Sequence, residues 1–130
     1  DQIAIRLASR RRLFGRTASG GVALPLPQGD PVLGVRLEFN FASLEDITEI
    51  TVAVRGPGSK SAGVWSWKPT AKDRKRAGRR RFTVRPGSDP APFTGPKSAD
   101  FTGADRVEIS AVVPAGASVE LGLKRVGWIH

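Results

Sequence analysis

The chain has 130 residues, a length that fits one domain with a single hydrophobic core. It has no cysteine, which excludes disulfides and thiolate chemistry, and its one histidine, His130, disfavours histidine-based metal sites and serine-histidine triads. Lys and Arg number 21 against 12 Asp and Glu, and the resulting net charge of +9 predicts an acidic partner such as nucleic acid, an anionic polysaccharide or a membrane surface.

The N-terminal segment, residues 1–17, predicts a short strand followed by an arginine-rich arm. Ile3, Ile5 and Leu7 alternate with more polar residues, which is the period of a strand. The arginines that follow are interpreted as an interface to an anion or a partner subunit, with a solvated loop as the alternative. These arginines are Arg10, Arg11, Arg12 and Arg16.

The clearest strand pattern of the chain lies between residues 30 and 57. Apolar residues occupy every second position at Leu33, Val35, Leu37, Phe39 and Phe41. A second alternation follows at Ile50, Val52 and Val54, and it ends at the breakers Gly56, Pro57 and Gly58. This period of two is typical of strands that are buried on one face, so both strands need a second apolar layer to cover them.

The rest of residues 18–130 continues in the same way, and we expect it to form one β-sandwich domain. Further strands are predicted around residues 22–26, 64–67, 81–84, 107–113 and 119–128, joined by turns rich in Gly and Pro. The total is about eight strands with no convincing helix. This pattern predicts an all-β fold, a two-sheet antiparallel sandwich of the jelly-roll type.

A strongly basic segment follows a pair of tryptophans. Trp65 and Trp67 lie two positions apart, so they share one side of a strand and could offer a flat surface for stacking a sugar ring or a base, or else belong to the core or a subunit contact. Residues 69–78 are interpreted as a projecting loop whose cations pair with carboxylate, sulfate or phosphate, or simply face solvent. The predicted ligand-binding residues are Trp65, Trp67, Lys68, Lys72, Arg74, Lys75, Arg76, Arg79, Arg80 and Arg81.

The acidic residues predict neither a metal site nor catalysis. Asp100, Asp105 and Glu108 lack the Asp-x-Asp spacing of a calcium loop. Glu45 and Asp46 are adjacent acids on a turn, where a solvated loop is the ordinary interpretation. We therefore expect no metal, no cofactor and no enzymatic activity.

The last part of the chain, FTGPKSADFTGADRVEISAVVPAGASVELGLKRVGWI, resembles the closing segment of the galactose-binding-like jelly rolls, which include many carbohydrate-binding modules. Residues 20–58 are similar to the first strands of that family. The resemblance implies a β-sandwich that binds rather than catalyses. The chain departs from the family in having no tyrosine and in its basic loop after Lys68. The matching positions are Phe101, Asp105, Val107, Ile109, Val119, Leu121, Val126 and Ile129.

These observations favour a non-catalytic module that docks a polysaccharide, most simply an anionic one, or another acidic surface. The alternative is a structural subunit of a larger assembly, such as a virion decoration, tail or fibre protein or a cell-surface subunit, with a possible homo-oligomer. Nucleic-acid binding ranks third, because few aromatic residues are interleaved with the basic ones. We expect an extracellular or virion-surface location and no membrane insertion, since the sequence has no apolar run of membrane-spanning length.

Overall fold

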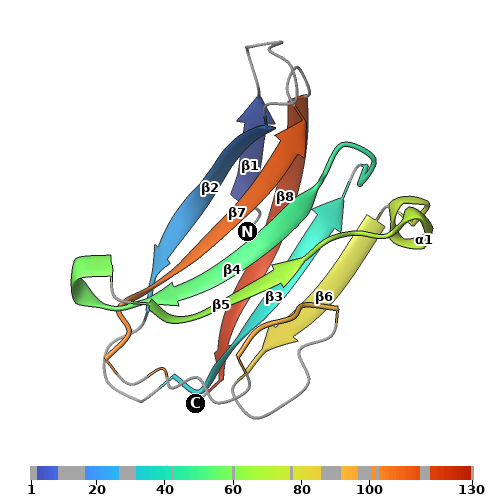
Figure 1. Ribbon diagram of the computed structural model, residues 1–130. Helices are drawn as coiled ribbons and strands as arrows, with labels where there is room; N and C mark the ends of the chain where they lie inside the picture. Colours follow the sequence, from blue (N-terminus) through green and yellow to red (C-terminus); the bar gives the residue numbers. More distant parts are fainter. Residues whose placement is uncertain are drawn as a thin grey trace.

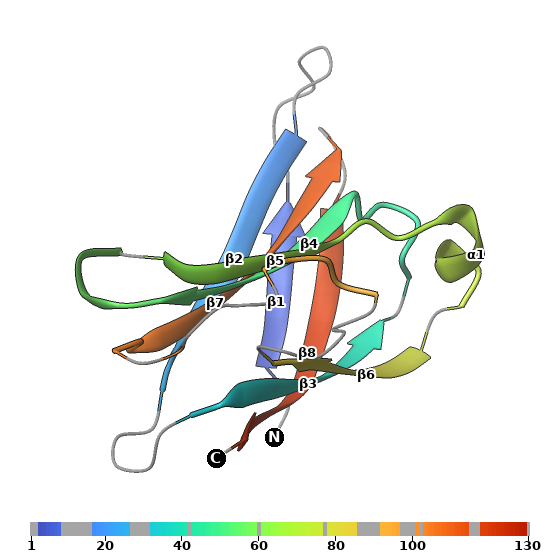
Figure 2. The ribbon, with the colours of Figure 1, turned by 60° about the horizontal axis from the view of Figure 1, so that its bottom comes forward.

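The computed structural model places two antiparallel sheets face to face (Figures 1 and 2). It describes residues 3–8, 17–26, 32–41, 43–59, 61–76, 78–85, 92–96, 101, 103–114 and 118–129. The described residues form the strands β1 (Ile3–Ala8), β2 (Thr17–Pro25), β3 (Gly34–Phe41), β4 (Glu49–Arg55), β5 (Ser61–Trp67), β6 (Gly78–Val84), β7 (Arg106–Pro114) and β8 (Ser118–Ile129). They also form a short 3-10 turn, η1 (Pro57–Ser59), and one helix, α1 (Ala71–Arg74).

The order of the strands identifies the fold. One sheet runs β1-β8-β3-β6 and the other runs β2-β7-β4-β5. Each strand therefore pairs with its counterpart from the other end of the chain: first with eighth, second with seventh, third with sixth and fourth with fifth. Four antiparallel pairs wrapped in this way make a jelly roll. The predicted all-β jelly-roll sandwich is confirmed.

The core lies between the two sheets and follows the predicted alternation. In β3, Val35, Leu37, Phe39 and Phe41 are all buried, and the rings of Phe39 and Phe41 stack with centroids 5.2 Å apart. Leu33 departs from the prediction: it precedes β3 and is 51% exposed, because the strand begins only at the next residue. The alternating apolar residues of β4, Ile50, Val52 and Val54, are likewise buried.

The N-terminal strand is part of the sandwich. β1 pairs with β8 from Ile3 opposite Leu123 to Ala8 opposite Ser118. The predicted interface arginines, Arg10, Arg11, Arg12 and Arg16, lie outside the described residues. The division of the chain at residue 17 stays a prediction, although β2 begins at Thr17.

The segment after β5 contains a helical turn that the sequence interpretation missed. Thr70 caps α1: its hydroxyl oxygen accepts a hydrogen bond from the N–H of Asp73, and the Asp73 carboxylate accepts one from the N–H of Thr70. This reciprocal pair is a capping box, which stabilises a helix start even where the following helix is one turn long. The prediction of a projecting loop without helix is therefore wrong at residues 71–74. No helix in the described part of the chain has the length and apolar character needed to cross a membrane.

Candidate anion-binding site

Trp65 and Trp67 do not form a stacking surface, and this part of the predicted site is wrong. Their exposed fractions are 0% and 3%, because they lie opposite Val52 and Ile50 of β4 on the core side of β5. Val64, the residue before Trp65, points outward and is exposed. Segments beyond β6 supply the rings that close over the pair: the ring of Trp65 lies 5.7 Å from that of Phe101, and the ring of Trp67 lies 6.0 Å from that of Phe93.

Two cations of the basic segment hold that segment in place. Arg74 donates hydrogen bonds to the carbonyl oxygens of Glu45, at 2.8 Å, and Ile47, at 3.2 Å. Arg80 forms an ion pair with Asp73 at 3.5 Å and lies over the ring of Trp67. The pKa of Asp73 is lowered, first by the hydrogen bond from the backbone of Thr70 and further by hydrogen bonds that include one from Arg80. Both arginines therefore have structural contacts within the chain.

The remaining predicted cations divide into two groups. Four of them are exposed on the segment around α1, namely Lys68, Lys72, Lys75 and Arg76. The other two, Arg79 and Arg81, belong to β6 and are exposed on the outer side of the sheet, away from the core. A hollow of about 620 Å³ is lined by residues of both groups, including Lys72, Arg76 and Arg79.

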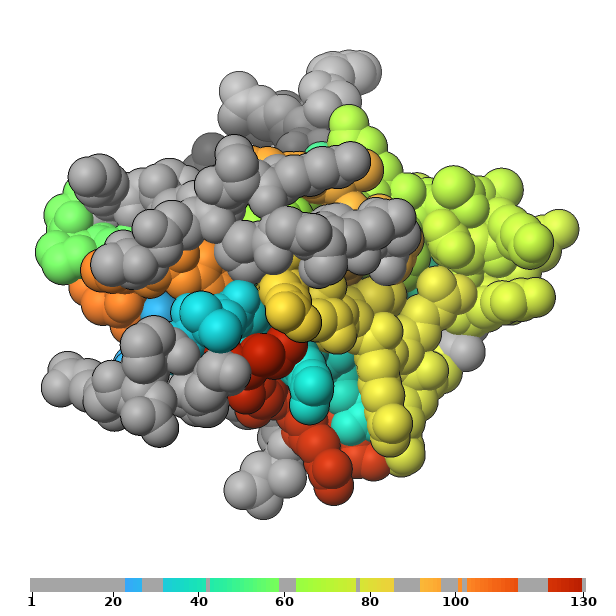
Figure 3. All heavy atoms as spheres, turned by 90° about the horizontal axis from the view of Figure 1, so that it is seen from below, coloured from blue at the N-terminus to red at the C-terminus, as the bar shows by residue number. Residues whose placement is uncertain are grey.

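The outer side of the β8-β3-β6 sheet carries a cluster that we call the arginine face: Arg36 of β3, Arg79 and Arg81 of β6, and Arg125 of β8, around Glu38 of β3. All four arginines are exposed. The strand register brings them together, because Arg81 and Arg125 lie opposite Glu38 on its two sides. Four positive charges against one negative charge leave a net charge of +3. Figure 3 shows atoms of β3, β6 and β8 meeting on one side of the molecule, beside the segment around α1.

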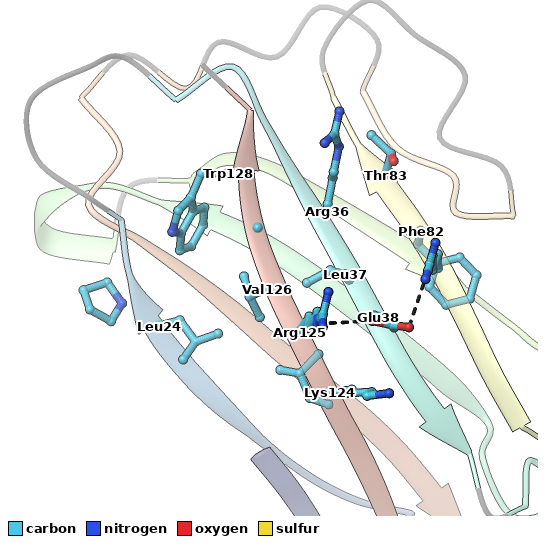
Figure 4. A pocket seen from close by; sticks show the side chains of 14 residues that line it. Leu24, Arg36, Leu37, Glu38, Phe82, Thr83, Lys124, Arg125, Val126 and Trp128 are labelled. Atoms are coloured by element: carbon cyan, nitrogen blue, oxygen red, sulfur yellow. Dashed lines mark hydrogen bonds and ion pairs between the residues drawn. The ribbon is translucent and has the colours of Figure 1, made fainter. Parts of the chain in front are cut away.

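Glu38 is the centre of the arginine face. Its side chain is only 7% exposed, and its Oε1 lies 3.4 Å from Nε of Arg81 and 3.5 Å from Nε of Arg79. Its Oε2 lies 3.8 Å from Nε of Arg125 (Figure 4). These are long ion pairs to well-exposed arginines, so the guanidinium groups keep free donors for an external anion. Glu38 thus lies between the arginines and neutralises only part of their charge.

A hollow of about 840 Å³ runs along β8 beside the arginine face (Figure 4). Arg36, Glu38, Arg81 and Arg125 are among its polar residues, and its other residues are mostly apolar. Gly127 lies opposite Arg36, lines the hollow and adds no side chain to it. The arrangement can bind an anion by hydrogen bonds and charge.

The outer face of the other sheet is electrically balanced. In β4 and β7 it carries Arg55 and Arg106 together with Glu49 and Glu108, which sum to zero. Glu108 accepts from Nε of Arg55 at 2.8 Å and from Nε of Arg106 at 3.0 Å. The hydrogen bond from Arg106, and then that from Arg55, lowers the pKa of Glu108, and the bond to Glu108 in turn raises the pKa of Arg106. The positive potential of the described sheets is therefore concentrated on the β8-β3-β6 side.

The sequence interpretation found two of the five residues of the arginine face. It included Arg79 and Arg81 and missed Arg36, Glu38 and Arg125. The sequence did contain a signal for Arg36 and Glu38: they are the polar residues that alternate with the buried residues of β3. Which strands flank β3 depends on long-range pairing, and this was not readable from the sequence.

Comparison with solved structures shows which known fold this is. A structure from work on the promiscuous specificity of carbohydrate-binding modules of the β-sandwich superfamily matches 99% of this chain with a TM-score of 0.56 and 12% identity. The two structures share the β-sandwich fold. The chain spans about half, 54%, of the length of that structure, and at 12% identity the likeness concerns the fold alone.

A second similar structure is that of infectious bursal disease virus, Gt strain. It matches 96% of this chain and 30% of its own length, with a TM-score of 0.29 and 10% identity. No protein-family model matches the chain. No curated protein matches it either.

Proposed function

We propose that the chain is a non-catalytic module that binds an anionic polysaccharide on the arginine face. The observation that carries the proposal is the set of four exposed guanidinium groups around one buried carboxylate on one face of a sheet. Guanidinium groups bind sulfate and carboxylate groups with two parallel hydrogen bonds. Arg81 and Arg125 lie on strands that flank β3, so their backbones are about 10 Å apart. A ligand with several anionic groups can therefore contact more than one arginine.

The burial of the described aromatic residues favours ligand binding by charge over ligand binding by stacking on rings. The exposed large apolar side chains of the described residues are Leu33 and Val64, neither of which has an aromatic ring, and the ring of Trp128 is half-buried. Neutral sugars and single-stranded nucleic acids are commonly bound by stacking on exposed rings. An anionic polysaccharide carries charged groups at intervals along its length, so it can be bound without such a ring.

The test compares heparin with dextran of similar length by calorimetry, at low and raised salt. We expect heparin to bind, dextran not to bind, and the affinity for heparin to fall steeply with salt. The double variant Arg81→Gln/Arg125→Gln should weaken heparin binding by more than about tenfold, since it removes two charge-assisted contacts. Its matched control, Lys72→Gln/Lys75→Gln, makes the same change in net charge and should have a much smaller effect.

Other results would favour the alternatives. Equal affinity for heparin and duplex DNA would favour nucleic-acid binding, and equal losses in the two double variants would show that only net charge matters. Light scattering at low salt and at about 0.5 M salt tests the structural-subunit alternative. A salt-resistant oligomer that no longer binds heparin would favour assembly through this face.

A further inference from the structure

The second half of β8 has no neighbour among the described strands on the side away from β3. β1 pairs with β8 only as far as Leu123, whereas β8 continues to Ile129 (Figure 1). Among the described strands, none pairs with residues 124–129 on the side away from β3. The edge of β5, in contrast, is paired at one position by a bridge between Ser66 and Thr94. An uncovered edge is a template for the addition of another strand.

The backbone groups that face this open side can be assigned. The carbonyl oxygen of Ile129 accepts a hydrogen bond from the N–H of Leu33, so the polar groups of Ile129 point toward β3. Successive residues of a strand point their backbone groups to opposite sides. The N–H and C=O groups of Val126 and Trp128 therefore point to the open side and are available to a new strand.

An apolar groove lies next to the same edge. Val126 and Trp128 project toward the core side of β8, because they lie opposite the buried Leu37 and Val35 of β3. Leu24 of β2 lies across from them, and Figure 4 shows all three around the hollow along β8. The three side chains are packed against the core but only half-buried. The groove can therefore bury further apolar side chains.

The outer side of the same edge is basic. Arg125 points away from the core and its side chain is 75% exposed, while Lys124 and Arg36 line the same hollow. A strand added beside β8 would place alternate side chains toward Val126 and Trp128 and the others beside Arg125. The complementary segment has apolar residues at every second position and acidic residues between them.

We propose that the open edge of β8 binds an extended, acidic and amphipathic segment of a partner protein by strand addition, in line with β1. Hydrogen bonds to Val126 and Trp128 supply affinity, and the groove and Arg125 select the alternating apolar and acidic side chains. A second copy of this chain is the poorer occupant, since its net charge of +9 opposes close approach. This site shares Arg125 and the hollow along β8 with the arginine face, but its hydrogen bonds come from the edge of β8 and do not require polysaccharide binding.

The test uses amide hydrogen exchange by NMR on the full chain, with and without a capped octapeptide of alternating valine and glutamate. In the free protein, the N–H groups of Val126 and Trp128 should exchange faster than those of Arg125 and Gly127, which face β3. The peptide should slow exchange at Val126 and Trp128 by at least about tenfold when it is near saturation. Heparin should leave exchange at these two groups unchanged.

Three controls make the outcome decisive. A peptide of alternating valine and lysine should bind more weakly, and a valine-glutamate peptide with a central proline should not protect the amides, because proline lacks the N–H donor. Arg125→Glu should weaken binding of the valine-glutamate peptide by roughly two- to fivefold and reverse the preference between the two charged peptides. Unchanged exchange at Val126 and Trp128 with saturating peptide, or equal binding of both charged peptides, would overturn the proposal.

Discussion

The guanidinium carbon of Arg80 lies 5.5 Å from the centroid of the Trp67 ring. Trp67 is a core residue and is 3% exposed. Arg80 also forms an ion pair with Asp73, and its side chain is only 21% exposed. One cation of the basic segment thus connects the capped turn α1 to the core. The basic segment is consequently packed against one end of the sandwich.

Arg80→Met should destabilise the fold by about 1–2 kcal/mol, because it removes a cation–π contact and charge-assisted hydrogen bonds while keeping an apolar stem. Urea unfolding measures the change. Arg76→Met is the matched control, since Arg76 is exposed, and it should change the free energy of unfolding by less than about 0.5 kcal/mol. Equal effects of the two variants would show that the contact over Trp67 does not contribute.

Gly95→Ala should destabilise the fold by about 1–3 kcal/mol through overpacking. A Cβ atom at Gly95 would lie 2.4 Å from Cδ1 of Trp65 and 2.7 Å from the carbonyl oxygen of Val64. Gly127→Ala is the control, because a Cβ there meets Cβ of Arg36 at an ordinary 3.7 Å. Thermal unfolding of both variants checks the expectation, and a neutral Gly95→Ala would contradict the close approach of residues 92–96 to Trp65.

Trp65→Ala should cost about 3–5 kcal/mol of stability, as expected for an aromatic residue removed from a core. Heparin affinity, measured under conditions where the variant is still folded, should stay unchanged. Val64→Ala, at the neighbouring position that faces outward, should have little effect on either quantity. A loss of heparin affinity in folded Trp65→Ala would restore a binding role to this tryptophan.

Glu38→Gln should raise heparin affinity by roughly two- to fivefold at low salt, since it adds one net positive charge at the centre of the arginine face. It should also lower stability by about 1 kcal/mol at low salt, because three arginines lose their shared partner. Added salt should reduce both differences. Calorimetry and urea unfolding give the two readouts, and weaker heparin binding by the variant would contradict the role given to Glu38.

Glu108 should make stability depend on pH. Its pKa is lowered in the folded state by Arg106 and Arg55, so its ionised form stabilises the fold above its unfolded pKa, and this contribution is lost as the pH falls through the folded pKa. Glu108→Gln should therefore be less stable than the parent chain at pH 7, and the difference should shrink below about pH 4. Thermal unfolding across this range is the measurement. A difference that stays constant down to pH 3 would exclude this carboxylate as its source.

The amino-acid sequence predicts the strands better than it predicts their partners. The alternation in β3 depends on local burial and was readable from Val35 to Phe41. The pair Trp65 and Trp67 was correctly placed on one side of a strand, but its burial depends on Phe93 and Phe101, which reach it from a distant segment. The turn α1 had a readable signal, the Thr70 and Asp73 capping box, which the charge of the segment obscured.

The arginine face shows the same limit. Arg36, Arg81 and Arg125 come from three strands that are far apart in the sequence, and only the pairing of β3 with both β6 and β8 brings them around Glu38. Charge counting located a basic segment after β5, where two of the cations are engaged in structural contacts. The strand register, which is a tertiary property, determines the site.

The most direct test of the account is an NMR titration with a heparin hexasaccharide that follows the Nε–H signals of the arginines. We expect the largest shifts at Arg36, Arg79, Arg81 and Arg125, with small shifts at Arg74, whose guanidinium binds backbone carbonyls. Shifts concentrated in residues 68–76, with the arginine face unchanged, would contradict the proposed site.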